Sequence, residues 1–128
     1  MDSPPVAVRS VLRLEPSRRL LHVRALHLSD DAPYALEERW VDLDTVPALG
    51  DLDLARESAN AWLVRNVPYT RGSFSLSATA ADPTTADSLD CSRGEALAKV
   101  ERTTWMNDRP ITWVRLFYHP GYRLATEL

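Results

Sequence analysis

Four side chains have the types and spacing needed to hold a small anion. Glu37 and Arg39 are two residues apart in a segment with strand character, so they share one face and can pair. His27 lies in the preceding strand-like segment, opposite them across a hairpin, and Arg115 shares its strand face with large apolar residues. The four residues form either a polar constellation inside a cavity or a set of surface cross-strand ion pairs, which contribute little energy.

The remaining chemistry-bearing residues show no pattern typical of a catalytic or metal centre. His22 and His27 are an odd number of positions apart in one expected strand, so they face opposite sides and cannot share a metal ion. The sequence contains no nucleophile elbow, phosphate-binding loop, zinc-protease motif or dinucleotide fingerprint. We therefore expect no catalytic residues, no metal site and no cofactor.

Composition limits the class of protein. The chain has 128 residues, of which 45% are hydrophobic, and its net charge of −3 offers no general basic face for nucleic acid. Cys91 is the only cysteine, which excludes an intrachain disulfide and fits a reducing compartment. No apolar run has membrane-spanning length. We expect a cytoplasmic protein in which residues 1–5 form a flexible tail and residues 6–128 form a single domain.

Alternating apolar residues predict strands at both ends of the chain. The first part forms a β-meander, because its connections are too short for crossover helices. In the C-terminal part, a hairpin turns at Asn107-Asp108-Arg109. The expected strands are Val6–Glu15, Leu20–Leu28, Pro33–Leu43, Thr70–Ala81, Ala96–Met106, Pro110–His119 and a short final one at Tyr122–Glu127.

Two short helices are expected between these strands. Ser58 suits the N-cap of a helix over Ala59–Asn66, and Pro83 suits the first turn of a helix that ends at Leu89. The strand between the helices carries hydroxyl groups along one face, which is either solvated or one wall of a polar pocket. This order of elements predicts an α+β domain with a mainly antiparallel sheet and short helices in the middle of the chain.

Three runs of sequence carry a resemblance to a known family: HVRALHLSDDAPYALEERWVDL, NAWLVRNVPYTRGSFSLSATA and ALAKVERTTWMNDRPITWVRLFYHPGYRL. In order and spacing they resemble the UTRA domain, the effector-binding domain of GntR-type transcription regulators of the histidine-utilisation-repressor subfamily. The resemblance covers roughly Val8 to Leu124. It implies a chorismate-lyase-like fold, with a six-stranded antiparallel sheet and a ligand cavity between sheet and helices.

The resemblance also implies ligand-binding positions. The arginines that hold phosphate in phosphosugar-sensing members fall on Ala25 and His27, which disfavours a phosphosugar and favours a smaller carboxylate. The acid of the family's third strand falls on Glu37. Arg115 and Tyr118 are an odd number of positions apart, so both face the ligand only if a bulge intervenes. The expected ligand-binding residues are His27, Glu37, Arg39, Tyr69, Thr70, Arg71, Thr112, Arg115 and Tyr118.

By the same resemblance, the chain is a ligand sensor and not an enzyme. Its effector would be urocanate or a related small carboxylate, and the protein would be a homodimer. DNA would be bound only through a winged helix-turn-helix domain, which these residues do not contain. A chorismate-lyase-like enzyme and a stand-alone dimerisation module without a ligand are the alternatives.

Overall fold

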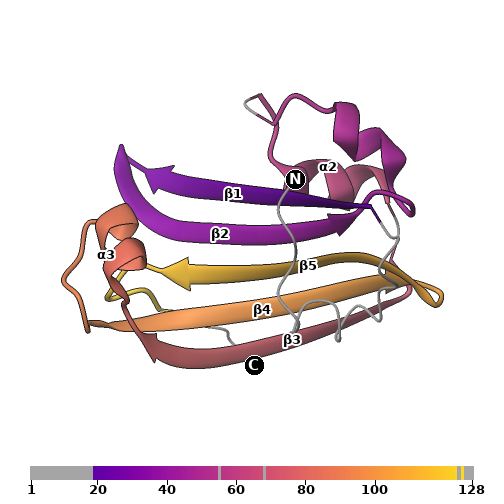
Figure 1. Cartoon of the computed structure of the whole chain (residues 1–128). Helices are drawn as coiled ribbons and strands as arrows, with labels where there is room; N and C mark the ends of the chain where they lie inside the picture. The colour runs from indigo at the N-terminus through magenta and orange to yellow at the C-terminus, as the bar shows by residue number, and fades with distance from the viewer. Residues whose placement is uncertain (1–18, 55, 68, 124, 126–128) are drawn as a thin grey trace. The chain divides into compact units, whose positions relative to one another are not determined.

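One antiparallel sheet forms the framework of the chain. The computed structural model describes residues 19–54, 56–67, 69–123 and 125. Within them, five strands lie in the order β1-β2-β5-β4-β3, and neighbouring strands run in opposite directions (Figure 1). Their bounds are β1 Leu20–Ser29, β2 Ala32–Asp42, β3 Arg71–Ala80, β4 Ala96–Met106 and β5 Arg109–Tyr118.

The α+β prediction is confirmed, with a difference in strand number. The family resemblance implied six strands, whereas the described residues form five. The expected strand Val6–Glu15 lies outside the described residues. At the other end, Tyr122, Arg123 and Ala125 belong to no strand, and the other three residues of the expected strand Tyr122–Glu127 lie outside the described residues.

Tight turns join β1 to β2 and β4 to β5. Asp30 and Asp31, between β1 and β2, have φ values of 50° and 64°. Asn107, between β4 and β5, has a φ of 55°. Asp and Asn tolerate this left-handed region better than most residues, because their short side chains can bond to the local backbone.

Both helices begin at a capped N-terminus. Helix α2 spans Ala59–Asn66, and its N-cap Ser58 accepts a hydrogen bond from the N–H of Ala61 at 3.0 Å. Helix α3 spans Pro83–Leu89, where Asp82 accepts from the N–H of Thr85 at 2.7 Å. The bounds of both helices and the Ser58 cap match the sequence prediction, which missed the Asp82 cap. A short 3-10 helix, η1 Pro47–Asp51, interrupts the loop before α2.

The described chain divides into two compact units with separate cores. Unit 1 contains residues 19–23 together with the described parts of Arg39–Phe74 and Arg102–Val114. Unit 2 contains Arg24–Glu38, Ser75–Glu101 and the described residues from Arg115 onwards. The candidate sites below each fall within one of these units.

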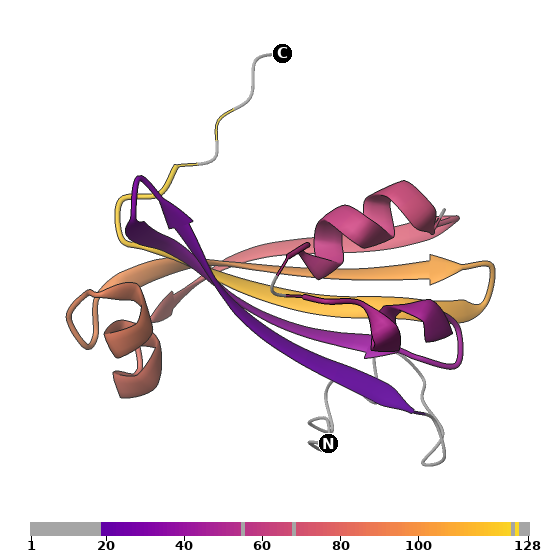
Figure 2. The same ribbon diagram turned by 90° about the horizontal axis from the view of Figure 1, so that it is seen from above.

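The core of unit 1 forms where helix α2 covers the sheet (Figure 2). Leu63 of α2 packs in one cluster with Val41 of β2 and Ile111 of β5, and the partly buried Trp62 and Val67 pack against it. A smaller cluster joins Leu20, Trp40 and Trp113.

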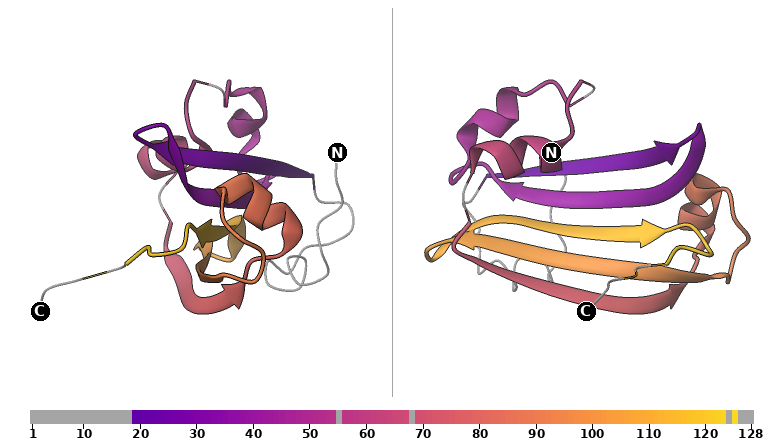
Figure 3. Two further views of the ribbon diagram at one scale, coloured as in Figure 1. Left: turned by 90° about the vertical axis from the view of Figure 1, so that its left-hand side faces the viewer. Right: turned by 180° about the vertical axis from the view of Figure 1, so that it is seen from behind.

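The core of unit 2 forms around helix α3, which follows β3 and leads the chain back into β4 (Figure 3). Ala86 and Leu89 of α3 pack with Leu36 and Leu97, and Phe117 packs against this cluster from β5. In the described part of the chain, neither helix has the length and apolar character needed to cross a membrane.

Candidate functional site

The main cavity of unit 1 lies between helix α2 and the sheet. Its volume is about 500 Å³, within the range of small-molecule sites. Period-two alternation places Arg102 and Thr104 on one face of β4, and Thr112 and Val114 on one face of β5. The lining residues are Arg39, Asn60, Leu63, Val64, Val67, Tyr69, Gly72, Ser73, Phe74, Arg102, Thr104, Ile111, Thr112 and Val114.

The charges that line this cavity have one sign. Arg39 and Arg102 are its charged lining residues, and no aspartate or glutamate of the described chain contributes to the lining. Arginine presents a planar fork of donors that matches a carboxylate in geometry. The cavity is therefore suited to an anion, with Ser73, Thr104 and Thr112 supplying hydroxyl groups.

Arg39 is held in the cavity wall by bonds from two elements. Its side chain is almost fully buried, with the residue 1% exposed. Nη1 donates to Thr112 Oγ1 of β5, and Nη2 donates to Asn60 Oδ1 of α2, both at 3.4 Å. The Thr112 hydroxyl in turn donates to the carbonyl oxygen of Trp40 at 2.8 Å. These bonds link the guanidinium to the first turn of α2 and to the neighbouring strands.

Arg102 is a cation without a partner in the described part of the chain. Its Nε is buried and has no hydrogen-bond acceptor there. A buried donor left unsatisfied costs about 1–3 kcal/mol, so such groups call for an explanation in a native structure. Because Arg102 lines the cavity, a ligand oxygen is the simplest acceptor for this N–H.

Among its described residues, the segment after helix α2 contributes Val67 and Tyr69 to the lining, and Tyr69 is 65% exposed. Its neighbours are engaged with the β4–β5 hairpin. The backbone N–H of Thr70 donates to Trp105 O at 2.8 Å, and the Thr70 hydroxyl accepts from the N–H of Asn107 at 2.6 Å. The guanidinium carbon of Arg71 lies 4.2 Å from the Trp105 ring centroid, a cation–π geometry.

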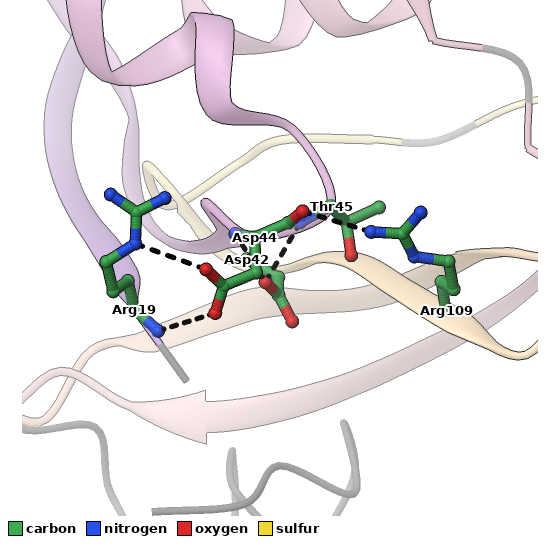
Figure 4. Close-up of polar contacts among 5 residues, drawn as sticks. All are labelled: Arg19, Asp42, Asp44, Thr45 and Arg109. Atoms are coloured by element: carbon green, nitrogen blue, oxygen red, sulfur yellow. Dashed lines mark hydrogen bonds and ion pairs between the residues drawn. The ribbon is translucent and has the colours of Figure 1, made fainter. Parts of the chain in front are cut away.

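The aspartates at the exit of β2 in unit 1 stabilise the backbone and do not line the cavity (Figure 4). Asp42 Oδ1 accepts from the N–H groups of Asp44 and Thr45, at 2.9 and 3.2 Å. The Asp44 carboxylate accepts from Nε and the backbone N–H of Arg19, each at 3.1 Å. Arg109 Nη2 donates to the Asp44 carbonyl oxygen at 3.0 Å. This network fixes the turn that leads towards α2.

Four of the predicted ligand residues belong to unit 2. His27 Nε2 lies 3.1 Å from Glu37 Oε1, and Glu37 is 4% exposed, so this is not a surface ion pair. Arg115 Nη2 donates to Glu38 Oε1 at 2.8 Å. Tyr118 stacks on the ring of Tyr122, with centroids 3.9 Å apart. Arg115 therefore holds a carboxylate of its own chain.

Of the nine residues predicted from sequence, Arg39, Tyr69 and Thr112 line the cavity of unit 1. Sequence reasoning missed Arg102 and Asn60. Alternation placed Arg102 on the same face of an expected strand as Thr104, but no local pattern showed that this face lines a cavity. Asn60 carried no signal beyond its place in the first turn of a helix. The hydroxyl-rich strand contributes Ser73 to the cavity, which agrees with the polar-wall alternative at that residue.

Comparison with known proteins identifies the family. The family model described as "UTRA domain" matches residues 2–122. The histidine utilization repressor of Pseudomonas putida is 30% identical over 116 residues, which is 91% of this chain and 46% of the relative. The repressor of Pseudomonas aeruginosa matches with the same identity and coverage. This chain therefore spans about half the length of these curated relatives.

Solved structures agree with this assignment. The C-terminal domain of histidine utilization repressor from Pseudomonas syringae pv. tomato str. DC3000 has a TM-score of 0.86 and 25% identity, over 94% of this chain and 86% of that one. A GntR-family transcriptional regulator from Enterococcus faecalis V583 has a TM-score of 0.75 and 19% identity, over 99% and 89%, and shows the shared fold alone. The chain belongs to the UTRA domain family.

Proposed function

We propose that this chain is the effector-sensing part of a GntR-type transcription regulator. We further propose that the cavity of unit 1 binds urocanate or a related small carboxylate. The family membership supports a sensing role, and the relatives' names point to the regulation of histidine utilisation. Relatives that are repressors also favour a binding protein over an enzyme.

One observation carries the choice of a carboxylate. The buried Nε of Arg102 has no acceptor within the described residues, and it lines a cavity whose charged lining residues are both arginines. A carboxylate would supply the missing acceptor and offset the positive charge. A neutral ligand of the same shape would not supply the charged acceptor that the buried Nε–H of Arg102 lacks within the described residues.

In this proposal Arg39 and Arg102 hold the carboxylate. Thr112, Asn60 and Tyr69 surround the rest of the ligand with hydroxyl, amide and aromatic groups. An imidazole ring requires both a donor and an acceptor, and hydroxyl and amide groups can supply them. The ligand roles predicted for His27, Glu37, Thr70, Arg71, Arg115 and Tyr118 stay predictions.

Effector binding would regulate DNA binding in a homodimer. We propose that a winged helix-turn-helix domain outside these residues contacts the operator, and that the ligand changes how two copies present it. The two-fold symmetry of such operators is the reason to expect a dimer.

The direct test is calorimetric titration of the full chain with urocanate and with its uncharged methyl ester. We expect saturable binding of urocanate and a loss of affinity of at least roughly tenfold for the ester, as expected for a lost charge-assisted hydrogen bond. Arg102→Gln should weaken urocanate binding by a similar factor. Arg93→Gln is the matched control, because Arg93 is exposed and lines neither cavity.

Two results would contradict the proposal. Equal affinity for the acid and the ester would show that the two arginines do not bind the carboxylate. Unchanged urocanate affinity in Arg102→Gln would place the ligand elsewhere. If urocanate does not bind but another small carboxylate binds and Arg102→Gln weakens that binding, the proposed site is right and the effector is the other carboxylate.

A further inference from the structure

Unit 2 contains a cavity of its own, between the start of helix α3 and the sheet. Its volume is about 310 Å³, at the lower end of the range for small-molecule sites. Unlike the cavity of unit 1, its lining carries both signs of charge. The charged lining residues are Arg24, Glu38, Asp82, Lys99 and Arg115.

The negative charges are fixed in place by bonds within unit 2. Glu38 Oε1 accepts from Arg115 Nη2 at 2.8 Å. The Asp82 carboxylate accepts from the N–H of Thr85 at 2.7 Å. This bond lowers the pKa of Asp82 below its ordinary value, and the nearby Arg115 contributes to the shift. Asp82 is therefore ionised at neutral pH, and it gives the cavity a permanent negative side.

Two of the positive charges are available to a ligand. Arg24 is exposed, and no hydrogen bond or ion pair of its side chain occurs within the described residues. The Lys99 ammonium lies 3.4 Å from Glu101 Oε1, which is long for a charge-assisted hydrogen bond. The hydroxyl groups of Thr79 and Thr84 also line the cavity and can donate to an anion.

Apolar side chains complete the lining. Leu36 and Leu97 are buried, and Phe117 lies beside them in the core of unit 2. The guanidinium carbon of Arg115 stands 5.2 Å from the Phe117 ring centroid, which holds the cation against this apolar floor. A small apolar group of a ligand would be removed from water by contact with these side chains.

We propose that the cavity of unit 2 binds a small zwitterion, an α-amino acid with an apolar side chain. Its carboxylate lies at Arg24 and Lys99, and its ammonium group faces Glu38 and Asp82. A ligand with only a negative charge would be repelled by the two carboxylates, and a ligand with only a positive charge would be repelled by the arginines and the lysine. Only a ligand that carries both charges matches both sides of the lining. This site is independent of the carboxylate proposed for unit 1.

The test uses three probes with the same branched side chain: leucine, 4-methylvalerate without the ammonium group, and isoamylamine without the carboxylate. Each is titrated into the full chain and followed by ¹H–¹⁵N NMR spectra. We expect saturable shifts with leucine in the amides around Arg24 and Lys99. Both analogues should bind at least roughly tenfold more weakly, as expected for the loss of a charged hydrogen-bonding partner.

Variants assign the binding to this cavity. Arg24→Gln should weaken leucine binding by a similar factor while leaving the fold intact, because the Arg24 side chain is exposed and makes no hydrogen bond or ion pair within the described residues. Arg93→Gln and Arg102→Gln should leave leucine binding unchanged. The proposal is overturned if leucine gives no saturable shift, if 4-methylvalerate binds as well as leucine, or if Arg24→Gln has no effect. Loss of urocanate binding alone would not affect it.

Discussion

Replacing Arg102 by Met should produce a protein that is more stable without ligand and less stable with it. Met preserves much of the length and apolar character of the arginine stem but removes every donor. In the unliganded chain, the variant loses a buried Nε–H that has no acceptor among the described residues. In the liganded chain, it loses a group proposed to hold the carboxylate.

The expected magnitudes follow from these two effects. Relieving one unsatisfied buried donor returns about 1–3 kcal/mol. Because the Arg102 side chain is half-buried, we expect the lower end, about 1 kcal/mol. For a domain of this size that raises the Tm by about 4 °C. A ligand present at about 100 times its Kd adds about 2.7 kcal/mol to the wild-type stability. If the Kd of the variant is at least about tenfold higher, the variant forgoes about 1.3 kcal/mol or more of this.

Thermal denaturation of both proteins, with and without urocanate, measures the two effects together. The curves should exchange order: Arg102→Met unfolds at the higher temperature without ligand, and the wild type does so with ligand. Arg93→Met is the control, because an exposed arginine outside both cavities should show neither change.

The reasoning fails if Arg102→Met lowers the Tm of the unliganded chain while Arg93→Met does not. That result would mean that Arg102 stabilises the fold through its charge or its donors. A ligand-induced Tm shift of wild-type size in Arg102→Met would refute the binding role separately, whatever happens to the unliganded protein.

Three further predictions concern the framework around the two cavities. Thr112→Val removes the hydroxyl that bonds Trp40 O and Arg39, and should lower the free energy of unfolding by about 1–3 kcal/mol in urea denaturation, whereas Thr112→Ser should be milder. Asp82 has a lowered pKa, so its charge stabilises the fold above the unfolded-state pKa, and this contribution is lost as the pH falls through the folded-state pKa. The stability advantage of wild type over Asp82→Asn should therefore shrink below about pH 4, and a constant difference across the acid range would contradict this. Leu89→Ala should cost about 2–5 kcal/mol, because Leu89 is 0% exposed in the core of unit 2, and a loss below that range would mean the helix repacks.

The elements that the sequence predicted well are those with local signals. Ser58 caps α2 and Pro83 opens α3 through contacts within a few residues, so the bounds of both helices could be read directly. Alternation likewise located the strands, because the side-chain period of a strand is a local property. Asp82 was missed as a cap although the signal was present, since an aspartate stands directly before the helix-opening proline.

Which residues come together in each site depends on contacts between segments that are far apart in the sequence. Arg115 and Glu38 are 77 positions apart, and their pairing follows from which strands are neighbours and in what register. Alternation assigned Arg115 and Glu38 each to one face of its strand, but it could not show that the two strands are neighbours in the sheet with these side chains side by side. The partner of Arg115 was therefore left open. For Arg102 the missing information was burial of one nitrogen, which no local pattern encodes.

The bonds of Thr70 have a consequence for directed evolution of ligand preference. Helix α2 closes with the N–H of Val67 bonded to Leu63 O at 2.9 Å, and the backbone of Thr70 is bonded to the β4–β5 hairpin. Only positions 68 and 69 lie between these two attachments. A library that varies the length of this segment would break one of them. Libraries that keep the length and randomise the side chains of Val64 and Tyr69, both exposed residues of the cavity lining, should retain a larger fraction of folded clones.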